Sequence, residues 1–155
     1  MRTTLPSSLH LLGLVLCGLV LSACFQEPEV SQEPEVLTGP FLIRDGITYD
    51  QNTNEPVTGI VEEFDEGGQL LSRGNYIDGE QNGLYEEFYE NGQLSERGNY
   101  IDGLQDGLFE MFHENGQLQY RGNYTDGLQD GLVEFFDEDG NLSRTRTYRN
   151  GVLVE

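Results

Sequence analysis

The chain contains no lysine and no tryptophan, so all eight of its basic side chains are arginines. Against these stand 28 aspartates and glutamates, which set the formal net charge at −20 at pH 7. Proteins that bind phosphate backbones or anionic headgroups use clustered lysines and arginines, which replace the counterions released on binding. The composition therefore argues against nucleic acid as a partner.

Cysteine and histidine are also scarce, with two of each in 155 residues. Cys17 lies in the apolar run near the N-terminus, so we expect Cys24 to be the only cysteine left after processing. His113 is the only histidine outside that N-terminal segment. A hydrolase of the Ser-His-Asp or Cys-His type needs an imidazole beside its nucleophile. We therefore expect no enzymatic activity.

Residues 1–23 have the pattern of a signal peptide. A short cationic start at Arg2 precedes an uncharged apolar run, Leu11 to Leu21, which is too short to cross a bilayer as a helix. The segment Leu21-Ser22-Ala23-Cys24 resembles the bacterial lipobox, which implies a lipid on Cys24. The alternatives left open are an ordinary secretory signal followed by an incidental cysteine, and a retained anchor.

Lipid on Cys24 implies a chain anchored at the bacterial cell envelope, since two or three acyl chains hold more firmly than one. By the same resemblance, Phe25 after the cysteine favours the outer membrane. Residues 24–40 then form an acidic linker of tandem Gln-Glu-Pro-Glu-Val units. Proline and mutually repelling carboxylates predict a disordered, extended spacer that holds the folded part off the bilayer.

A 24-residue repeat fills most of the remaining chain. Each unit contains two β-rich runs separated by glycine-containing turns, which predicts an antiparallel meander. Residues 41–58, ahead of the first unit, read as a degenerate opening hairpin. The four units occupy residues 59–82, 83–106, 107–130 and 131–155.

The register within a unit follows from the turn Glu90-Asn91-Gly92. A three-residue loop with Gly92 in the left-handed conformation pairs Phe88 with Leu94. Strict alternation from that pair predicts one repeated face, which we expect to be the core. In the second unit this face comprises Leu84, Glu86, Phe88, Leu94, Gly98 and Tyr100.

The opposite face varies from unit to unit and combines aromatic rings with arginines, a methionine and a histidine. This is the composition of interface anchors, and also that of a solvated surface on which arginines stack on rings. Both interpretations stay open at this level. The residues that we expect to bind a partner there are Tyr85, Tyr89, Arg97, Phe109, Met111, His113 and Arg121.

The acidic residues offer two further kinds of chemistry. A column of glutamates, one per unit, is spaced about 10 Å, which is wide for a glycosidase pair and implies no cleft. We expect these glutamates to hydrogen-bond neighbouring strands or tyrosine hydroxyls. They are Glu62, Glu86, Glu110 and Glu134.

Calcium is the better inorganic candidate, because aspartates cluster in the glycine-rich turns and offer oxygen ligands. Their spacing matches neither the EF-hand nor the calcium-binding nonapeptide repeat, and aspartate also suits such turns sterically. We therefore expect no cofactor, and calcium stays a weak alternative. The aspartates concerned are Asp102, Asp106, Asp126 and Asp130.

The repeat pattern Gly-Leu-x-Glu-x-Phe-x-Glu-Asn-Gly-Gln-Leu-x-x-Arg-Gly-Asn-Tyr resembles the MORN repeat, specifically the bacterial variant of YwqK-type antitoxin proteins. The resemblance covers about residues 41–155. It implies an elongated, single-layer antiparallel β-meander with one hairpin per repeat. It also implies a scaffold or binding surface without a catalytic apparatus.

These observations predict an all-β, non-enzymatic lipoprotein that binds a protein partner or an envelope polymer. The alternative is an antitoxin or immunity protein that neutralises a cognate toxin, since the acidic excess would suit a basic toxin. A third class is a purely structural spacer in the envelope.

Overall fold

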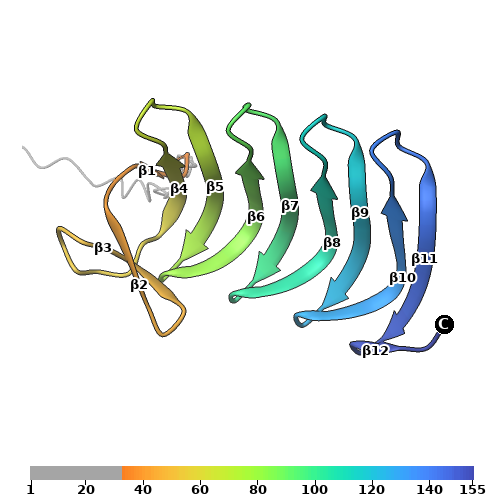
Figure 1. Cartoon of the computed structure of the whole chain (residues 1–155). Helices are drawn as coiled ribbons and strands as arrows, with labels where there is room; N and C mark the ends of the chain where they lie inside the picture. The colour runs from red at the N-terminus through yellow and green to blue at the C-terminus, as the bar shows by residue number, and fades with distance from the viewer. Residues whose placement is uncertain (1–32) are drawn as a thin grey trace, which may run out of the picture. The chain divides into compact units, whose positions relative to one another are not determined.

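A computed structural model describes residues 33–155, and all the regular structure in this part of the chain is β-strand (Figure 1). Ten strands form one sheet and two more form a separate hairpin. This region contains no helix that could span a bilayer. The expected signal peptide at 1–23, Cys24 and the linker up to residue 32 lie outside the described residues.

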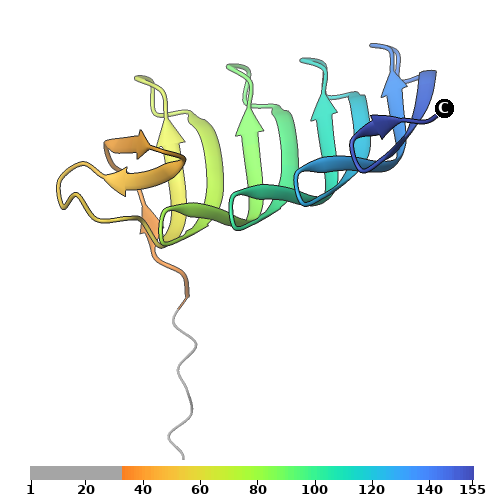
Figure 2. The ribbon, with the colours of Figure 1, turned by 90° about the horizontal axis from the view of Figure 1, so that it is seen from below.

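The main sheet is an antiparallel meander in which, from β4 to β12, each strand pairs with the next one along the chain. The expected all-β, single-layer meander is thereby confirmed, and Figure 2 shows its hairpins following one another in a single row. Its strands are β1 (Val36–Leu37), β4 (Gly59–Phe64), β5 (Leu70–Ile77), β6 (Glu80–Phe88), β7 (Leu94–Ile101), β8 (Leu104–Phe112), β9 (Leu118–Thr125), β10 (Leu128–Phe136), β11 (Leu142–Arg149) and β12 (Val152–Leu153).

Two-residue turns connect one unit to the next. Asp102 and Gly103 both have positive φ, at 48° and 76°, which is the type I′ geometry that matches the twist of a hairpin. Asp78-Gly79 and Asp126-Gly127 repeat this conformation. The turn comprises only these two residues, because the residues from Leu104 onward already belong to β8 (Leu104–Phe112).

The turn inside each unit has the predicted register. Gly92 has φ 81°, and the backbone N–H of Tyr89 donates to the carbonyl of Gln93 at 2.8 Å. Phe88 is paired with Leu94, as predicted.

Beyond this turn the predicted faces are wrong, because one residue bulges out of the pairing. Glu87 pairs with Glu96 while Phe88 pairs with Leu94, so Ser95 is extra and the alternation shifts by one. Gly98 and Tyr100 therefore lie on the face opposite to Leu84. Arg97 and Arg121, in turn, do not share a face with Tyr85.

We call the side that carries Tyr85, Phe109 and Val133 the aromatic face, and the side that carries Arg97 and Glu110 the ion-pair face. The aromatic face holds the core, since Phe109, Tyr120 and Val133 are buried there, Val133 completely. The ring centroids of Phe109 and Tyr120 are 6.1 Å apart, in an edge-to-face arrangement.

The repeated leucines of the ion-pair face do not form the expected core. Leu84, Leu108 and Leu132 are between 41% and 50% exposed. Glycines explain why the rings pack on the other face instead. A Cβ atom at Gly98 would lie 2.7 Å from Cδ2 of Phe109, so only glycine leaves room for the ring of the neighbouring strand.

The N-terminal part differs in detail from a simple opening hairpin. Strands β2 (Phe41–Arg44) and β3 (Ile47–Asp50) do pair around the turn Asp45-Gly46, but they form their own sheet. Bonds such as Thr48 N–H to the carbonyl of Gly79, at 2.8 Å, attach this hairpin to the β4 end of the main sheet.

The stretch expected to be linker, residues 24–40, contains a strand near its end. Val36 and Leu37 form β1 and pair in parallel with Ile60 and Val61 of β4. The backbone N–H of Ile60 donates to the carbonyl of Glu35 at 2.8 Å. Backbone pairing with the sheet therefore begins before the opening hairpin.

Candidate functional site

The turns inside the four units line up in a row at one end of the strands of the main sheet, at the top of Figure 1. We call this row of turns the loop edge. Each turn is closed by a backbone hydrogen bond from its first residue to its fifth, between 2.8 and 3.0 Å long. The turns are 65–69, 89–93, 113–117 and 137–141.

Side chains of the loop edge reach across to the backbone of the next unit. The hydroxyl of Tyr89 donates to the carbonyl of Phe112 at 2.6 Å, and the amide of Asn91 donates to that of Glu114 at 2.9 Å. The side chains of the middle turns are therefore held in place by their neighbours.

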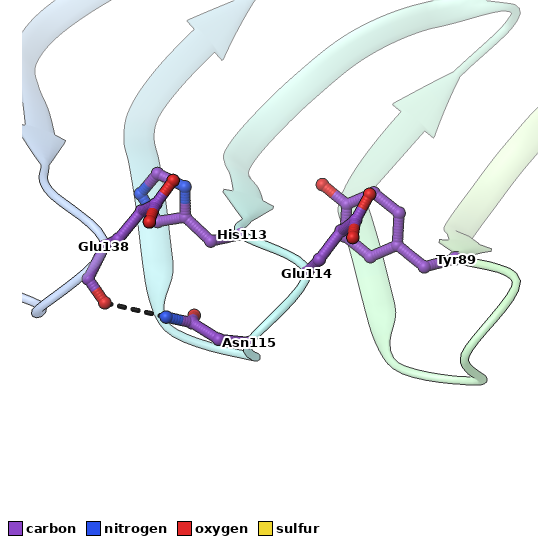
Figure 3. Close-up of a pocket in the computed structure, with 5 residues that line it drawn as sticks. All are labelled: Tyr89, His113, Glu114, Asn115 and Glu138. Atoms are coloured by element: carbon purple, nitrogen blue, oxygen red, sulfur yellow. Dashed lines mark hydrogen bonds between the residues drawn. The ribbon is translucent and has the colours of Figure 1, made fainter.

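The third unit repeats this arrangement. Nε2 of His113 lies 3.2 Å from the carbonyl oxygen of Phe136. The amide of Asn115 donates to the carbonyl of Glu138 at 2.7 Å, which is the dashed line in Figure 3. Equivalent positions thus make equivalent contacts one unit further along.

Open hollows lie between successive turns. One of about 480 Å³ is lined by Tyr89, His113, Glu114, Asn115 and Glu138 (Figure 3). Its walls combine a ring from one unit with a carboxylate from the next, Tyr89 with Glu114 and His113 with Glu138. Such a combination suits a cationic group, which stacks on rings and forms charge-assisted hydrogen bonds with carboxylates.

The loop edge is strongly acidic and contains no arginine. In its last turn, the backbone N–H of Asn141 lowers the pKa of Asp137, so this carboxyl is ionised at neutral pH. The carboxylates of this edge are all exposed, and they are Asp65, Glu66, Glu90, Glu114, Asp137, Glu138 and Asp139.

A further hollow of about 420 Å³ lies where the aromatic face meets the loop edge. Met111, His113 and Tyr120 contribute to its lining, together with Phe135 and Arg144. Met111 is 36% exposed on the aromatic face.

The ion-pair face carries a row of alternating glutamates and arginines, each directly paired across to the next strand. Arg97 bonds Glu110 at 2.7 Å and Arg121 bonds Glu134 at 2.7 Å, while Arg73 pairs with Glu62. The row comprises Glu62, Arg73, Glu86, Arg97, Glu110, Arg121 and Glu134.

The glutamate column was thus predicted correctly to bond neighbouring strands, for Glu62, Glu110 and Glu134. The donors are arginine side chains rather than tyrosine hydroxyls. Because an arginine stands between successive glutamates, the carboxylates do not face each other across open space.

The structure brings together three of the seven residues expected to bind a partner. Tyr89, Met111 and His113 gather at or beside the loop edge. Phe109 is buried, and Tyr85 stacks edge-to-face on Tyr100 with ring centroids 6.0 Å apart.

The other two expected residues, Arg97 and Arg121, are engaged in ion pairs on the opposite face. On the aromatic face, burial raises the pKa of Tyr85 above its ordinary value, so that its hydroxyl stays protonated.

Sequence reasoning missed Glu114 and Glu138. The 24-residue recurrence of Glu-Asn-Gly and Glu-Asp-Gly in the turns was the available signal.

The turns at the other edge do not assemble a metal site. Across residues 33–155, no three or more histidines, cysteines or acidic residues are placed to hold a metal ion. Asp102 instead accepts a hydrogen bond from the amide of Asn82 at 3.0 Å. Asp106 lies 3.4 Å from the backbone nitrogen of Asp126, and Asp130 bonds the following turn in the same way.

Comparison with known proteins agrees with the repeat. A family model described as "MORN repeat variant" matches residues 57–78, 81–102, 105–126 and 129–150, which is more than half of the chain. No curated protein matches the chain.

Among solved structures, the chain is similar to part of a TarM mutant of S. aureus crystallised with fondaparinux, alpha-GlcNAc-glycerol and UDP. The identity is 15% and the TM-score 0.39. The match covers 74% of this chain and 20% of that chain, so the chain spans about a fifth of that protein's length.

Proposed function

The chain belongs to the MORN repeat variant family, and from this premise we propose that it is a non-enzymatic binding module whose loop edge takes a cationic segment of a protein partner. The observation that carries the proposal is the pairing of a ring with a carboxylate in the hollow between successive turns, at Tyr89 with Glu114 and His113 with Glu138.

Two properties of the loop edge support this function. The side chains of Tyr89 and Asn91 are already fixed by hydrogen bonds to the next unit, so their conformational entropy would fall little on binding. Equivalent turns are two strands apart, about 10 Å, so an extended segment along the edge meets one acidic turn after another. Such a segment would carry lysines or arginines.

We place this module at the bacterial cell envelope, tethered by lipid on Cys24 and sorted to the outer membrane because Phe25 follows it. The support is the lipobox-like segment Leu21-Ser22-Ala23-Cys24. Incorporation of labelled palmitate, followed by membrane fractionation, tests the tether. We expect labelled wild type in the outer-membrane fraction and no label in Cys24→Ser. Labelling that persists in the variant would remove this part of the proposal.

The binding role is tested by pull-down with the full chain and its Glu114→Gln, Glu138→Gln double variant. The matched control removes two carboxylates from the opposite edge, as Asp102→Asn and Asp126→Asn, because asparagine tolerates the same positive φ. We expect the loop-edge variant to lose a partner that the control retains. Equal recovery by all three chains would assign the loop edge no binding role.

The acidic loop edge also favours a second candidate function, an antitoxin or immunity protein that captures a basic toxin by charge complementarity. Co-expression separates the two. If the product of a neighbouring gene is lethal and this chain suppresses the lethality, the partner is that toxin. A chain that suppresses no such lethality yet still captures its partner is an envelope binding module.

A further inference from the structure

Two arginines of the last long strand, β11, lie against the same aromatic ring. The guanidinium carbon of Arg144 is 4.3 Å from the ring centroid of Phe135, and that of Arg146 is 5.9 Å from it. Both side chains belong to the aromatic face, because Arg144 pairs with Phe135 and Arg146 with Val133. Two positive charges therefore converge on one ring.

These two charges have no counter-charge in the described part of the chain. Neither guanidinium forms an ion pair with a carboxylate of residues 33–155, although the chain has 28 acidic residues. Arg146 contacts only the hydroxyl of Tyr148, at 3.5 Å. The three arginines of the ion-pair face, by contrast, each bond a glutamate. An anion at Phe135 would thus meet guanidinium donors that are available for charge-assisted hydrogen bonds.

The pair of arginines belongs to the last unit and not to the repeat. At the position of Arg146, the first three units carry Gly74, Gly98 and Gly122. At the position of Arg144 they carry a serine, a glutamate and a tyrosine. The unit thus folds three times without an arginine at either position, so the fold itself does not require these two charges.

Arg144 also lines the hollow of about 420 Å³ that opens on the aromatic face. The other polar groups around this hollow are mostly engaged. The hydroxyl of Tyr120 accepts a hydrogen bond from a glutamine side chain at 2.8 Å, and that of Ser143 donates to the carbonyl of Phe135 at 3.0 Å. The hollow therefore presents the apolar surfaces of Met111 and two rings beside a guanidinium whose donors are available.

This combination suits a group that has an apolar body and a carboxylate. An apolar body removes the methionine and the rings from water. A carboxylate accepts two parallel hydrogen bonds from a guanidinium, which a single charged amine cannot supply in that geometry. The amide of Gln119 lines the same hollow, makes no hydrogen bond to another residue of 33–155, and can bond a neighbouring peptide group.

We propose that this hollow binds the C-terminal residue of a protein partner, where that residue is apolar. Its side chain lies against Met111 and Phe135, and its carboxylate bonds Arg144 and Arg146. A chain end fits because it carries an apolar side chain and a carboxylate on the same carbon atom. The hollow also lies open on the face, whereas sites for free small molecules enclose most of their ligand.

The site is distinct from the loop edge in charge and in residues. The loop edge is acidic and suits a cationic segment, whereas this hollow has a basic wall. His113 lines the hollows of both, but Glu114 and Glu138 line only that of the loop edge. Glu114→Gln with Glu138→Gln should therefore bind a C-terminal residue like wild type, so the two proposals stand or fall separately.

The first test titrates acetyl-alanyl-alanyl-phenylalanine into the full chain in a non-ionic detergent, followed by NMR. Acetylation removes the terminal amine, which the acidic loop edge would otherwise attract. The comparison peptide has the same sequence and a C-terminal amide. We expect the acid to bind about tenfold more tightly or better, because the amide cannot form the ion pair, and to shift the methyl signal of Met111. Equal binding of acid and amide, or no binding of the acid, would overturn the proposal.

A charge-removing variant locates the carboxylate. Arg144→Met keeps an apolar side chain over the ring of Phe135 and should bind the acid about tenfold more weakly, while its binding of the amide stays as in wild type. Arg149→Met is the matched control, since it makes the same change on the same strand but on the opposite face. An equal loss in both variants would mean a general effect of charge and would contradict the assignment. Should Arg144→Met fail to fold, the comparison of acid with amide on wild type decides alone.

A third ligand separates a chain end from a free acid. The small acid 3-phenylpropionate has the same ring and a carboxylate but no peptide group for Gln119 to bond. We expect the acetylated peptide to bind about fivefold more tightly or better. Equal affinity of the two would assign the hollow to a free aromatic acid and overturn the assignment to a partner's C-terminus.

Discussion

Glu87 and Glu96 lie directly opposite each other on β6 and β7, two like charges on the aromatic face of the second unit. Burial raises the pKa of Glu96 above its ordinary value, and the charge of Glu87 adds to the effect. The corresponding pairs of the next two units, Met111 with Tyr120 and Phe135 with Arg144, contain no such repulsion. The second unit is therefore weakened at this point.

Replacing this carboxyl should stabilise the protein at neutral pH. Because the folded pKa of Glu96 is raised, the folded state binds its proton more tightly, and stability falls as pH rises from the ordinary glutamate pKa through the raised one. We expect Glu96→Gln to add roughly 0.5 kcal/mol to the free energy of unfolding at pH 7, since the site is partly solvated.

Urea unfolding at pH 7 and at about pH 3.5 measures this gain, which should vanish at the lower pH, where glutamates are protonated. The Glu87→Gln variant removes the other member of the pair and should give a gain at pH 7 as well. A gain for Glu96→Gln that is equally large at both pH values would contradict the assignment.

Gly98 should not tolerate a methyl group. A Cβ atom there would lie 2.7 Å from Cδ2 of Phe109, so Gly98→Ala forces the ring to move and should lower the free energy of unfolding by about 1–3 kcal/mol. Thermal and urea unfolding measure the change. In a Phe109→Val background the penalty should shrink, because the clashing ring is gone. An undiminished penalty would show that the ring is not the cause.

Arg97 should matter more for stability than the arginines of β11. Glu110 is buried, and Arg97→Met leaves its carboxylate without an ion-pair partner, which should lower the free energy of unfolding by about 1–3 kcal/mol. Arg149→Met, at an exposed site that has no ion pair with any other residue of 33–155, is the control and should change the free energy of unfolding by less than about 0.5 kcal/mol. Adding Glu110→Gln to Arg97→Met should recover part of the loss.

The hydroxyl of Tyr89 should contribute to the contact between units. Tyr89→Phe removes the 2.6 Å bond to the carbonyl of Phe112 and should lower the free energy of unfolding by about 0.5–1.5 kcal/mol. Tyr49→Phe provides a matched control, since the Tyr49 hydroxyl makes no hydrogen bond within the described residues. Equal stability of Tyr89→Phe and wild type would mean that solvent replaces the bond without loss.

The sequence was sufficient for the repeat, its turns and the pairing of Phe88 with Leu94, because Gly92 and the Asp-Gly pairs between units mark positive-φ positions locally. It was not sufficient for the faces, because one bulged residue reverses the alternation. The bulged position holds leucine, serine, glutamine and serine in the four successive units, so no residue type common to all of them marks it. The bulged residues are Leu71, Ser95, Gln119 and Ser143.

The candidate site was predictable only in part for a related reason. Tyr89 and His113 stood out by residue type, but their partners Glu114 and Glu138 come from the following unit. Recognising them requires knowing that the turns of successive units lie side by side. Likewise, the strand at Val36 and Leu37 carries the composition of a linker, and only tertiary pairing with β4 makes it a strand.

The hydrogen bond that ties Tyr89 to Phe112 recurs one unit further along the chain as the contact between His113 and Phe136. A gene segment that encodes one whole unit can therefore be duplicated or deleted, because the contacts between the units that become neighbours are of the same kind as before. Evolution can adjust the reach of such a protein in steps of about 10 Å, the width of two strands, while leaving the fold at either end untouched.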